Sequence, residues 1–192
     1  GQVIAFEPAP ETRKVLERHI EFNHCSNITV NPQALADTIG TRTFAAFSGE
    51  MWGYSSFAPP ETNETANSVA VEVTTLDTVI TNEIAPKIRL IKLDLEGAEY
   101  AALTGAKRLL MNDTPDLLLE IQAEHLERQG ATIDQVTELL ESYGYETYRP
   151  EWTPQNRLSL VRATLYEPDL LRPNFFATTR PERLRERGIV LL

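Results

Sequence analysis

The sequence has little cysteine and histidine: one cysteine, Cys25, and three histidines among 192 residues. A single cysteine excludes an intramolecular disulfide and a cysteine-rich metal site. It fits a reducing compartment or indifference to redox, and we expect a cytoplasmic protein. No spacing of histidine, cysteine and carboxylate side chains indicates a metal site.

Long apolar runs and clusters of basic residues are also missing. No run approaches the roughly 20 apolar residues that span a bilayer, so no membrane partner is expected. Acidic residues outnumber basic ones, 28 to 18, and the formal net charge is −10. Because nucleic-acid binding depends on neutralising phosphates with Lys and Arg, this balance argues against a nucleic-acid partner.

The remaining composition describes one domain of alternating strands and helices. With 192 residues and 42% hydrophobic content, the chain can build one sizeable core, so we treat residues 1–192 as a single domain. Strand-like segments are 3–8, 27–36, 41–47, 69–76, 87–95, 116–122, 145–150 and 174–180, and helix-like segments are 10–23, 98–111, 132–144 and 181–187. Several strands are apolar throughout, which predicts a three-layer α/β fold with a mainly parallel sheet.

Three parts of the chain depart from this alternation. Residues 48–68 carry Gly, Pro, Ser and Asn without periodicity, which predicts a long loop. Its aromatic residues, Trp52, Tyr54 and Phe57, either cover a substrate or pack back onto the domain. Residues 149–192 are predicted to form C-terminal strands and a surface helix. The chain opens inside a strand-like run without an initiator Met, so we expect an N-terminally truncated domain.

Acidic residues end three of the predicted strands. Glu7 follows the first strand, Asp94 and Glu96 follow "LIKL", and Glu120 follows "DLLL". Ligands of open parallel sheets bind beyond the carboxyl ends of the strands, so these side chains predict a binding site at that edge. An acid at the end of an early strand also commonly binds the two hydroxyls of a ribose.

Three of these acids have a structural alternative. Side chains alternate along a strand, so Lys92 and Asp94 share a face, and Lys92 can simply compensate the charge of Asp94. Asp94 and Glu96 precede Gly97 and a helix, where the helix dipole favours acids. Glu7 can be a solvated end of its strand.

Six segments follow one another in the order and spacing of a known family. They are "VIAFEPAPETRKVLERHIEFN", "NITVNPQALADTIGTRTF", "VEVTTLDTVI", "IRLIKLDLEGAEYAALTGAKRLL", "PDLLLEIQ" and "LLESYGYETY". Together they resemble the FkbM-type methyltransferases over about residues 3 to 148, and the blocks "AFEP" and "KLDLEGAE" are the most specific. Members are class I enzymes that depend on S-adenosylmethionine (SAM), mostly O-methyltransferases of sugars and natural products.

The resemblance implies a Rossmann-like fold and a set of site residues. Glu7 matches the acid that binds the adenosine ribose, and Gln33 with Ala34 lies at the loop where the family's adenine sits. Asp94 and Glu96 match the acids of the family motif D-x-E-G. An acidic site suits SAM, because the cofactor carries a sulfonium cation. The Gly-rich loop "D-x-G-A-N-x-G" that follows the family's first strand has no counterpart in this sequence.

The reaction that the resemblance implies is displacement of the SAM methyl group by a hydroxyl of a small molecule or glycan. Alignment is then the main task of the protein, and the hydroxyl must also lose its proton. Asp94 and Glu96 are candidate general bases by position, and His125 by its reference pKa.

Two other functional classes remain open. A non-catalytic or truncated Rossmann-like binding domain would keep the fold without the cofactor. A fragment of a dinucleotide-dependent oxidoreductase would also place an acid after an early strand, but no catalytic His or Tyr/Lys pair of a substrate-binding half is evident.

Overall fold

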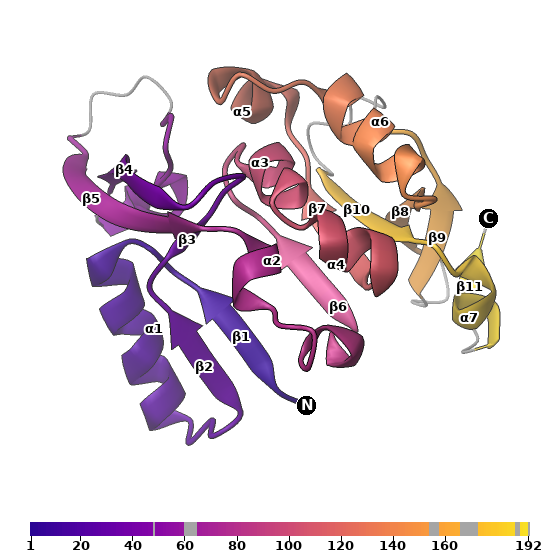
Figure 1. The fold of residues 1–192 in the computed structure, drawn as a ribbon, viewed down its shortest axis with the longest axis horizontal. Coiled ribbons are helices and arrows are strands. Elements are labelled where there is room, and N and C mark those ends of the chain that lie inside the picture. The colour runs from indigo at the N-terminus through magenta and orange to yellow at the C-terminus, as the bar shows by residue number, and fades with distance from the viewer. Residues whose placement is uncertain (48, 60–64, 154–157, 166–172, 187–188, 192) are drawn as a thin grey trace.

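The computed structural model describes residues 1–47, 49–59, 65–153, 158–165, 173–186 and 189–191 (Figure 1). The strands are β1 (Val3–Phe6), β2 (Ile28–Asn31), β3 (Ala34–Leu35), β4 (Gly40–Ala46), β5 (Asn67–Thr74), β6 (Leu90–Leu93), β7 (Asp116–Glu120), β8 (Glu146–Trp152), β9 (Leu158–Arg162), β10 (Asn174–Thr178) and β11 (Val190–Leu191). The α-helices are α1 (Pro10–Phe22), α2 (Leu76–Val79), α3 (Glu99–Thr104), α4 (Lys107–Asn112), α5 (Ala123–Arg128), α6 (Ile133–Ser142) and α7 (Pro181–Glu186). Two 3₁₀ helices are η1 (Gly49–Tyr54) and η2 (Ala85–Lys87). These elements confirm the α/β class.

The sheets are mixed, so the prediction of a mainly parallel sheet is wrong. One sheet has the order β11-β9-β8-β10-β7-β6, another the order β3-β5-β4, and within the described residues β1 and β2 form a third sheet. Helices connect the parallel pairs β1–β2 and β6–β7. However, β10 inserts between β7 and β8 antiparallel to both, and β8–β9 and β4–β5 are also antiparallel. Apolar runs indicate a buried strand but do not give its direction, which is why the sequence pattern misled.

The predicted loop 48–68 and the predicted helix 98–111 also differ from the structure. The helix η1 occupies part of the loop, β5 begins inside it at Asn67, and residues 48 and 60–64 lie outside the described part of the chain. The predicted helix is two helices, α3 and α4, that are separated at Gly105.

The main core forms where helices cover one face of the six-stranded sheet. In Figure 1, α3, α4 and α6 lie over β6, β7, β10 and β8. The fully buried side chains of this core come from both layers: Leu93, Leu117 and Leu119 from strands, and Leu103, Leu109, Leu110, Val136 and Leu140 from helices. Burying each of these side chains contributes roughly 1.5–3 kcal/mol, so this face holds β6 and β7 in place.

Helix ends follow signals that are visible in the sequence. Thr132 and Gln135 form the reciprocal capping box of α6, and Pro10 is the first residue of α1. The amides of Arg108 and Leu109 in α4 donate to the Asp77 carboxylate, at 2.7 and 3.0 Å. No helix in the described ranges is long and apolar enough to cross a membrane.

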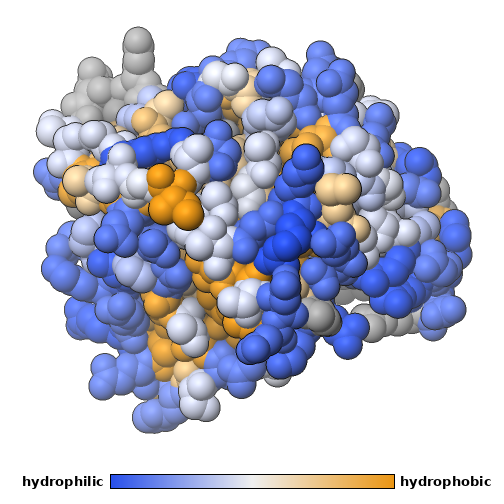
Figure 2. All heavy atoms as spheres, viewed as in Figure 1, coloured by the Kyte–Doolittle hydropathy of each residue, from blue (hydrophilic) through white to orange (hydrophobic). Residues whose placement is uncertain are grey.

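Strands β1 and β6 run next to each other in the same direction (Figure 1). They belong to different sheets of the described chain, and residues that follow both strands line one pocket. Figure 2 shows a hydrophobic area of the surface in this region, and the exposed hydrophobic side chains include Val3 of β1 and Leu90 of β6. The carboxyl ends of β1 and β6 therefore lie at the same edge of the molecule.

Gly105 provides a test of how tightly the three-stranded sheet packs against the helices. A Cβ atom at this position would lie 2.1 Å from the carbonyl oxygen of Ala36 and 3.2 Å from Cβ of Thr75. We expect Gly105→Ala to lower the free energy of unfolding by about 1–3 kcal/mol, because the backbone must move apart. Urea unfolding measures this change. Gly40→Ala is the control, since a Cβ atom on Gly40 would meet no other residue within 4 Å apart from its chain neighbours. Equal stability of the two variants would contradict the close packing of Gly105 against Ala36.

Candidate functional site

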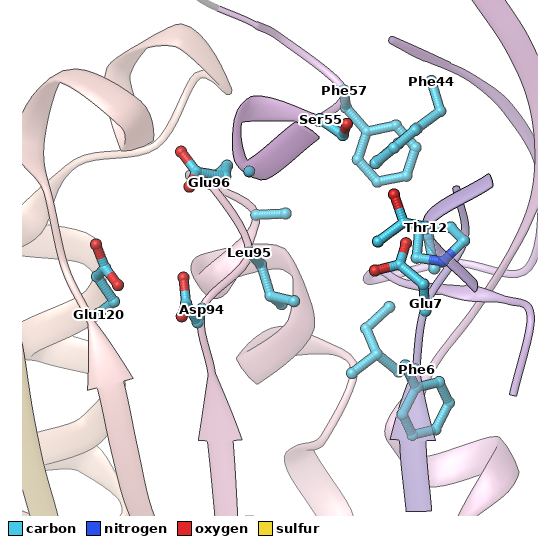
Figure 3. A pocket seen from close by; sticks show the side chains of 15 residues that line it. Phe6, Glu7, Thr12, Phe44, Ser55, Phe57, Asp94, Leu95, Glu96 and Glu120 are labelled. Atoms are coloured by element: carbon cyan, nitrogen blue, oxygen red, sulfur yellow. The ribbon is translucent and has the colours of Figure 1, made fainter. Parts of the chain in front are cut away.

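A pocket of about 430 Å³ lies at the carboxyl ends of β1, β6 and β7 (Figure 3). This volume is within the usual range of small-molecule sites. Its lining residues are Phe6, Glu7, Pro8, Thr12, Ala34, Leu35, Phe44, Gly53, Ser55, Phe57, Asp94, Leu95, Glu96, Ala98 and Glu120. The three strands are parallel in direction, so their ends deliver carboxylates from distant parts of the sequence to one place.

Glu7 stands on the β1 side of the pocket, as predicted from its position after the strand. The amide of Ala9 donates to its Oε1 atom at 2.8 Å, and Figure 3 shows the carboxylate directed into the pocket. Burial raises the pKa of Glu7, while the Ala9 amide and the charge of Arg13 act in the opposite direction. Arg13 itself donates to the carbonyl oxygens of Glu7 and Pro8, at 3.0 and 3.2 Å.

Asp94 and Glu120 lie next to each other across β6 and β7. The pairing of Leu93 with Leu119 places the residues that follow them side by side. Lys92 forms an ion pair with Asp94, which confirms the predicted pairing. Burial is the largest cause that raises the pKa of Glu120, and the neighbouring Asp94 raises it further. The two carboxylates therefore crowd one rim of the pocket.

Glu96 lies in the turn between β6 and α3 in an unusual backbone conformation. Its φ is 52°, in the left-handed region that non-glycine residues seldom adopt, and Gly97 follows with φ 102°. The turn directs the Glu96 side chain toward α5, where Nδ1 of His125 lies 3.0 Å from its Oε2 atom. That contact lacks the geometry of a hydrogen bond, and Oε2 has no hydrogen-bond partner among the described residues.

The electrostatic environment raises the pKa of Glu96 to about 7. Burial is the largest cause, followed by the charges of Asp94, Glu120 and Glu99, and Arg128 partly offsets them. The pKa of His125 is lowered, first by burial and then by Arg128, while Glu124 acts in the opposite direction. Near neutral pH, Glu96 can therefore take up or release a proton beside a mostly neutral imidazole.

The two residues predicted to lie at the adenine behave differently. Ala34 lines the pocket and is 4% exposed. Gln33 is not among the lining residues; its side chain donates to Glu72 at 3.3 Å, and its amide donates to Asn31 at 2.9 Å. A role for Gln33 in binding stays a prediction.

Sequence reasoning missed the apolar wall of the pocket. Phe44 and Phe57 pack edge to face with ring centroids 5.2 Å apart, and the guanidinium of Arg42 lies 5.8 Å from the Phe57 ring centre. Phe57 thus both packs on the domain and lines the pocket. The Tyr54 side chain is exposed, and the Trp52 side chain lies outside what the structure describes. The only sequence signal was the cluster of aromatic residues in the predicted loop.

Glu120 was noted among the acids at the strand ends, but the sequence assigned it no role in catalysis or cofactor binding, and it lines the pocket. Despite the crowding of acids, no group of three or more His, Cys, Asp or Glu side chains in the described ranges is arranged to hold a metal ion. An α/β fold that brings carboxylates and an apolar wall to the ends of parallel strands is typical of nucleotide-cofactor enzymes.

Comparisons with known proteins show which family the chain resembles. The family model described as the methyltransferase FkbM domain matches residues 1–147. The chain is 28% identical to Methyltransferase sdnD from Sordaria araneosa over 85% of its own length and 72% of that protein. It is 27% identical to Methyltransferase 1 from Beauveria bassiana (strain ARSEF 2860) over 79% of its own length and 66% of that protein. The crystal structure of methyltransferase FkbM from Methylobacillus flagellatus KT is similar with a TM-score of 0.49 and 19% identity, over 92% of this chain and 36% of that one.

The family match covers most of the chain and includes the turn with Asp94 and Glu96 as well as Glu7. This chain therefore belongs to the methyltransferase FkbM domain family. It spans about a third of the solved protein and about two thirds to three quarters of the two curated relatives.

The raised pKa of Glu96 predicts a pH dependence of stability. A carboxyl whose pKa is raised in the folded state contributes stability that is present below its ordinary pKa and is lost as the pH rises through the raised value. For Glu96 this window runs from about 4.5 to about 7. We expect Glu96→Gln to unfold at a higher urea concentration than the unsubstituted protein at pH 8, and the gain to shrink toward pH 4.

The matched control for this experiment is Glu138→Gln, because Glu138 is an exposed residue of α6. The control variant should follow the unsubstituted protein at both pH values. A Glu96→Gln effect that is equal at pH 4 and pH 8 would show that the carboxyl is not perturbed.

Proposed function

We propose that this chain binds SAM in the pocket at the ends of β1, β6 and β7 and transfers its methyl group to a hydroxyl oxygen of a small molecule or glycan. The observation that carries the proposal is the crowding of four carboxylates, from Glu7, Asp94, Glu96 and Glu120, around one pocket that also has an apolar wall. Burial raises the pKa of three of these carboxyls, so a bound cation would relieve an existing electrostatic cost.

The residues of the pocket fit SAM in their chemistry. The acidic side suits a sulfonium cation, and the apolar side, with Ala34, Phe44 and Phe57, suits a flat adenine ring. Glu7 would accept hydrogen bonds from the ribose hydroxyls through the carboxylate that Figure 3 shows in the pocket. Asp94 would lie near the charged end of the cofactor, held in place by Lys92.

When bound, SAM would supply an electrophilic methyl group on sulfur. The task of the chain is to hold the acceptor hydroxyl in line with that group and to remove its proton. Glu96 is the base that the electrostatics favour, because its pKa of about 7 allows it to be ionised at neutral pH and still accept a proton. His125, whose Nδ1 lies 3.0 Å from Oε2 of Glu96, would take up that proton once a small side-chain rotation brings the two atoms into hydrogen-bond geometry.

Binding of SAM by the purified chain, measured by calorimetry, tests the proposal. We expect binding that Glu7→Gln weakens by about tenfold to a hundredfold, since a hydrogen bond to a charged group contributes about 1.5–3 kcal/mol. Glu17→Gln is the control, because Glu17 is exposed on α1, and it should bind as the unsubstituted protein does.

The other functional classes give different outcomes. Binding of NAD in place of SAM would support an oxidoreductase fragment. A folded protein that binds neither cofactor would support a non-catalytic domain and refute the proposed function.

A further inference from the structure

Glu99 is a buried carboxyl that does not line the main pocket. It is the first residue of α3 and is 2% exposed. A charge buried to this extent is costly unless hydrogen bonds satisfy it. The amide of Leu95 donates to its Oε1 atom at 2.6 Å. Burial raises the pKa of Glu99 to about 7, although hydrogen bonding from the amides of Leu95, Glu99 itself and Gly97 favours the ionised form. The carboxyl therefore faces the backbone of the turn that precedes its own helix.

That turn needs support, because its backbone is strained. Glu96 has φ 52°, a conformation that is unfavourable for a non-glycine residue and persists only where the surroundings enforce it. The hydrogen bond from Leu95 to Glu99 lies directly before Glu96 and ties the turn to the first turn of α3. The side chain of Glu99 thus fixes the backbone on one side of Glu96.

Helix α5 fixes the same turn from the other side. A Cβ atom on Gly97 would lie 2.1 Å from the carbonyl oxygen of His125 and 3.0 Å from Cγ of Gln129. The turn is therefore pressed between α5 and the Glu99 carboxyl, with little room to adopt another conformation. The result is the observed placement of the Glu96 carboxyl beside His125 and on the pocket.

We propose that Glu99 is a positioning residue whose buried carboxyl holds the turn 95–97 in the conformation that directs Glu96 into the pocket. The role of Glu96 as a base rests on the proposed function, but the positioning itself does not require a cofactor. Glu99 does not contact the reacting groups, so its effect must act through Glu96.

Two substitutions separate positioning from a simple effect of charge. Glu99→Gln removes the charge but keeps an oxygen that can reach the Leu95 amide. Glu99→Asp keeps the charge but shortens the side chain by one methylene, so its carboxylate no longer reaches the Leu95 amide. The titration of Glu96 is followed in each protein by ¹³C NMR of the side-chain carboxyl carbons, with the signal assigned from Glu96→Gln, and thermal melting shows that each variant is folded.

Positioning predicts that the titration midpoint of Glu96 falls from about 7 toward 4.5 in Glu99→Asp, by about one pH unit or more, because Glu96 leaves its buried place. In Glu99→Gln the fall should be smaller, since Glu99 contributes less to the raised pKa than Asp94 and Glu120 do. If Glu99 acted only through its charge, the Glu96 midpoint would be unchanged in Glu99→Asp and lowered in Glu99→Gln. That order of midpoints would overturn the proposal.

If Glu99→Asp does not fold, Glu99→Ala takes its place, because it removes the charge as Glu99→Gln does but leaves no acceptor for the Leu95 amide. A Glu96 midpoint that falls further in Glu99→Ala than in Glu99→Gln supports positioning, and equal midpoints in the two variants contradict it. SAM binding is measured separately: a protein that binds no SAM but shows the predicted order of midpoints would refute the proposed function and leave the positioning role intact.

Discussion

The burial of carboxylates at the ends of β1, β6 and β7, with repulsion among those that follow β6 and β7, is the constraint on which the site depends. Four acids line one pocket, burial raises the pKa of Glu7, Glu96 and Glu120, and the charge of Asp94 raises the pKa of Glu96 and Glu120 further. The fold sustains them with local partners: Lys92 for Asp94, the Ala9 amide for Glu7, and Gln122 for Glu120. None of these partners removes the burial or the crowding, and the raised pKa of Glu96 is the consequence first of burial and then of the neighbouring acids.

The strained turn after β6 is the geometric counterpart of this crowding. If the strand continued in extended form, Asp94 and Glu96, which are two residues apart, would point to the same face. The left-handed conformation of Glu96 changes the direction of the chain, so that Glu96 faces α5 while Asp94 stays on the rim beside Glu120. Buried hydrogen bonds to Glu99 and close packing of Gly97 on α5 maintain this arrangement. This arrangement lowers the stability of the fold but keeps an acid with a shifted pKa beside a pocket, as at many catalytic sites.

Several site residues were predictable because their signals are local. The end of an apolar run followed by an acid marked Glu7, Asp94 and Glu96, and the period of two placed Lys92 on the face of Asp94. The apolar wall was not predictable in this way, because Phe44 and Phe57 meet through the three-stranded sheet and the segment that follows β4. The role of Glu99 was equally hidden, since a helix-start glutamate in the sequence does not reveal that its carboxyl turns back to the amide of Leu95.

The sequence by itself determined the α/β class, the membership of the family, the capping of α6 and the acids at the strand ends. These properties depend on periodicity and on contacts between residues a few positions apart, which a linear pattern records. Only the tertiary structure decided that the sheets are mixed, that β10 inserts between β7 and β8, and that Glu96 lies beside His125. Strand direction and side-chain proximity depend on pairings between segments far apart in the chain, whose energies come from burial and hydrogen bonds that form only when the whole domain has folded.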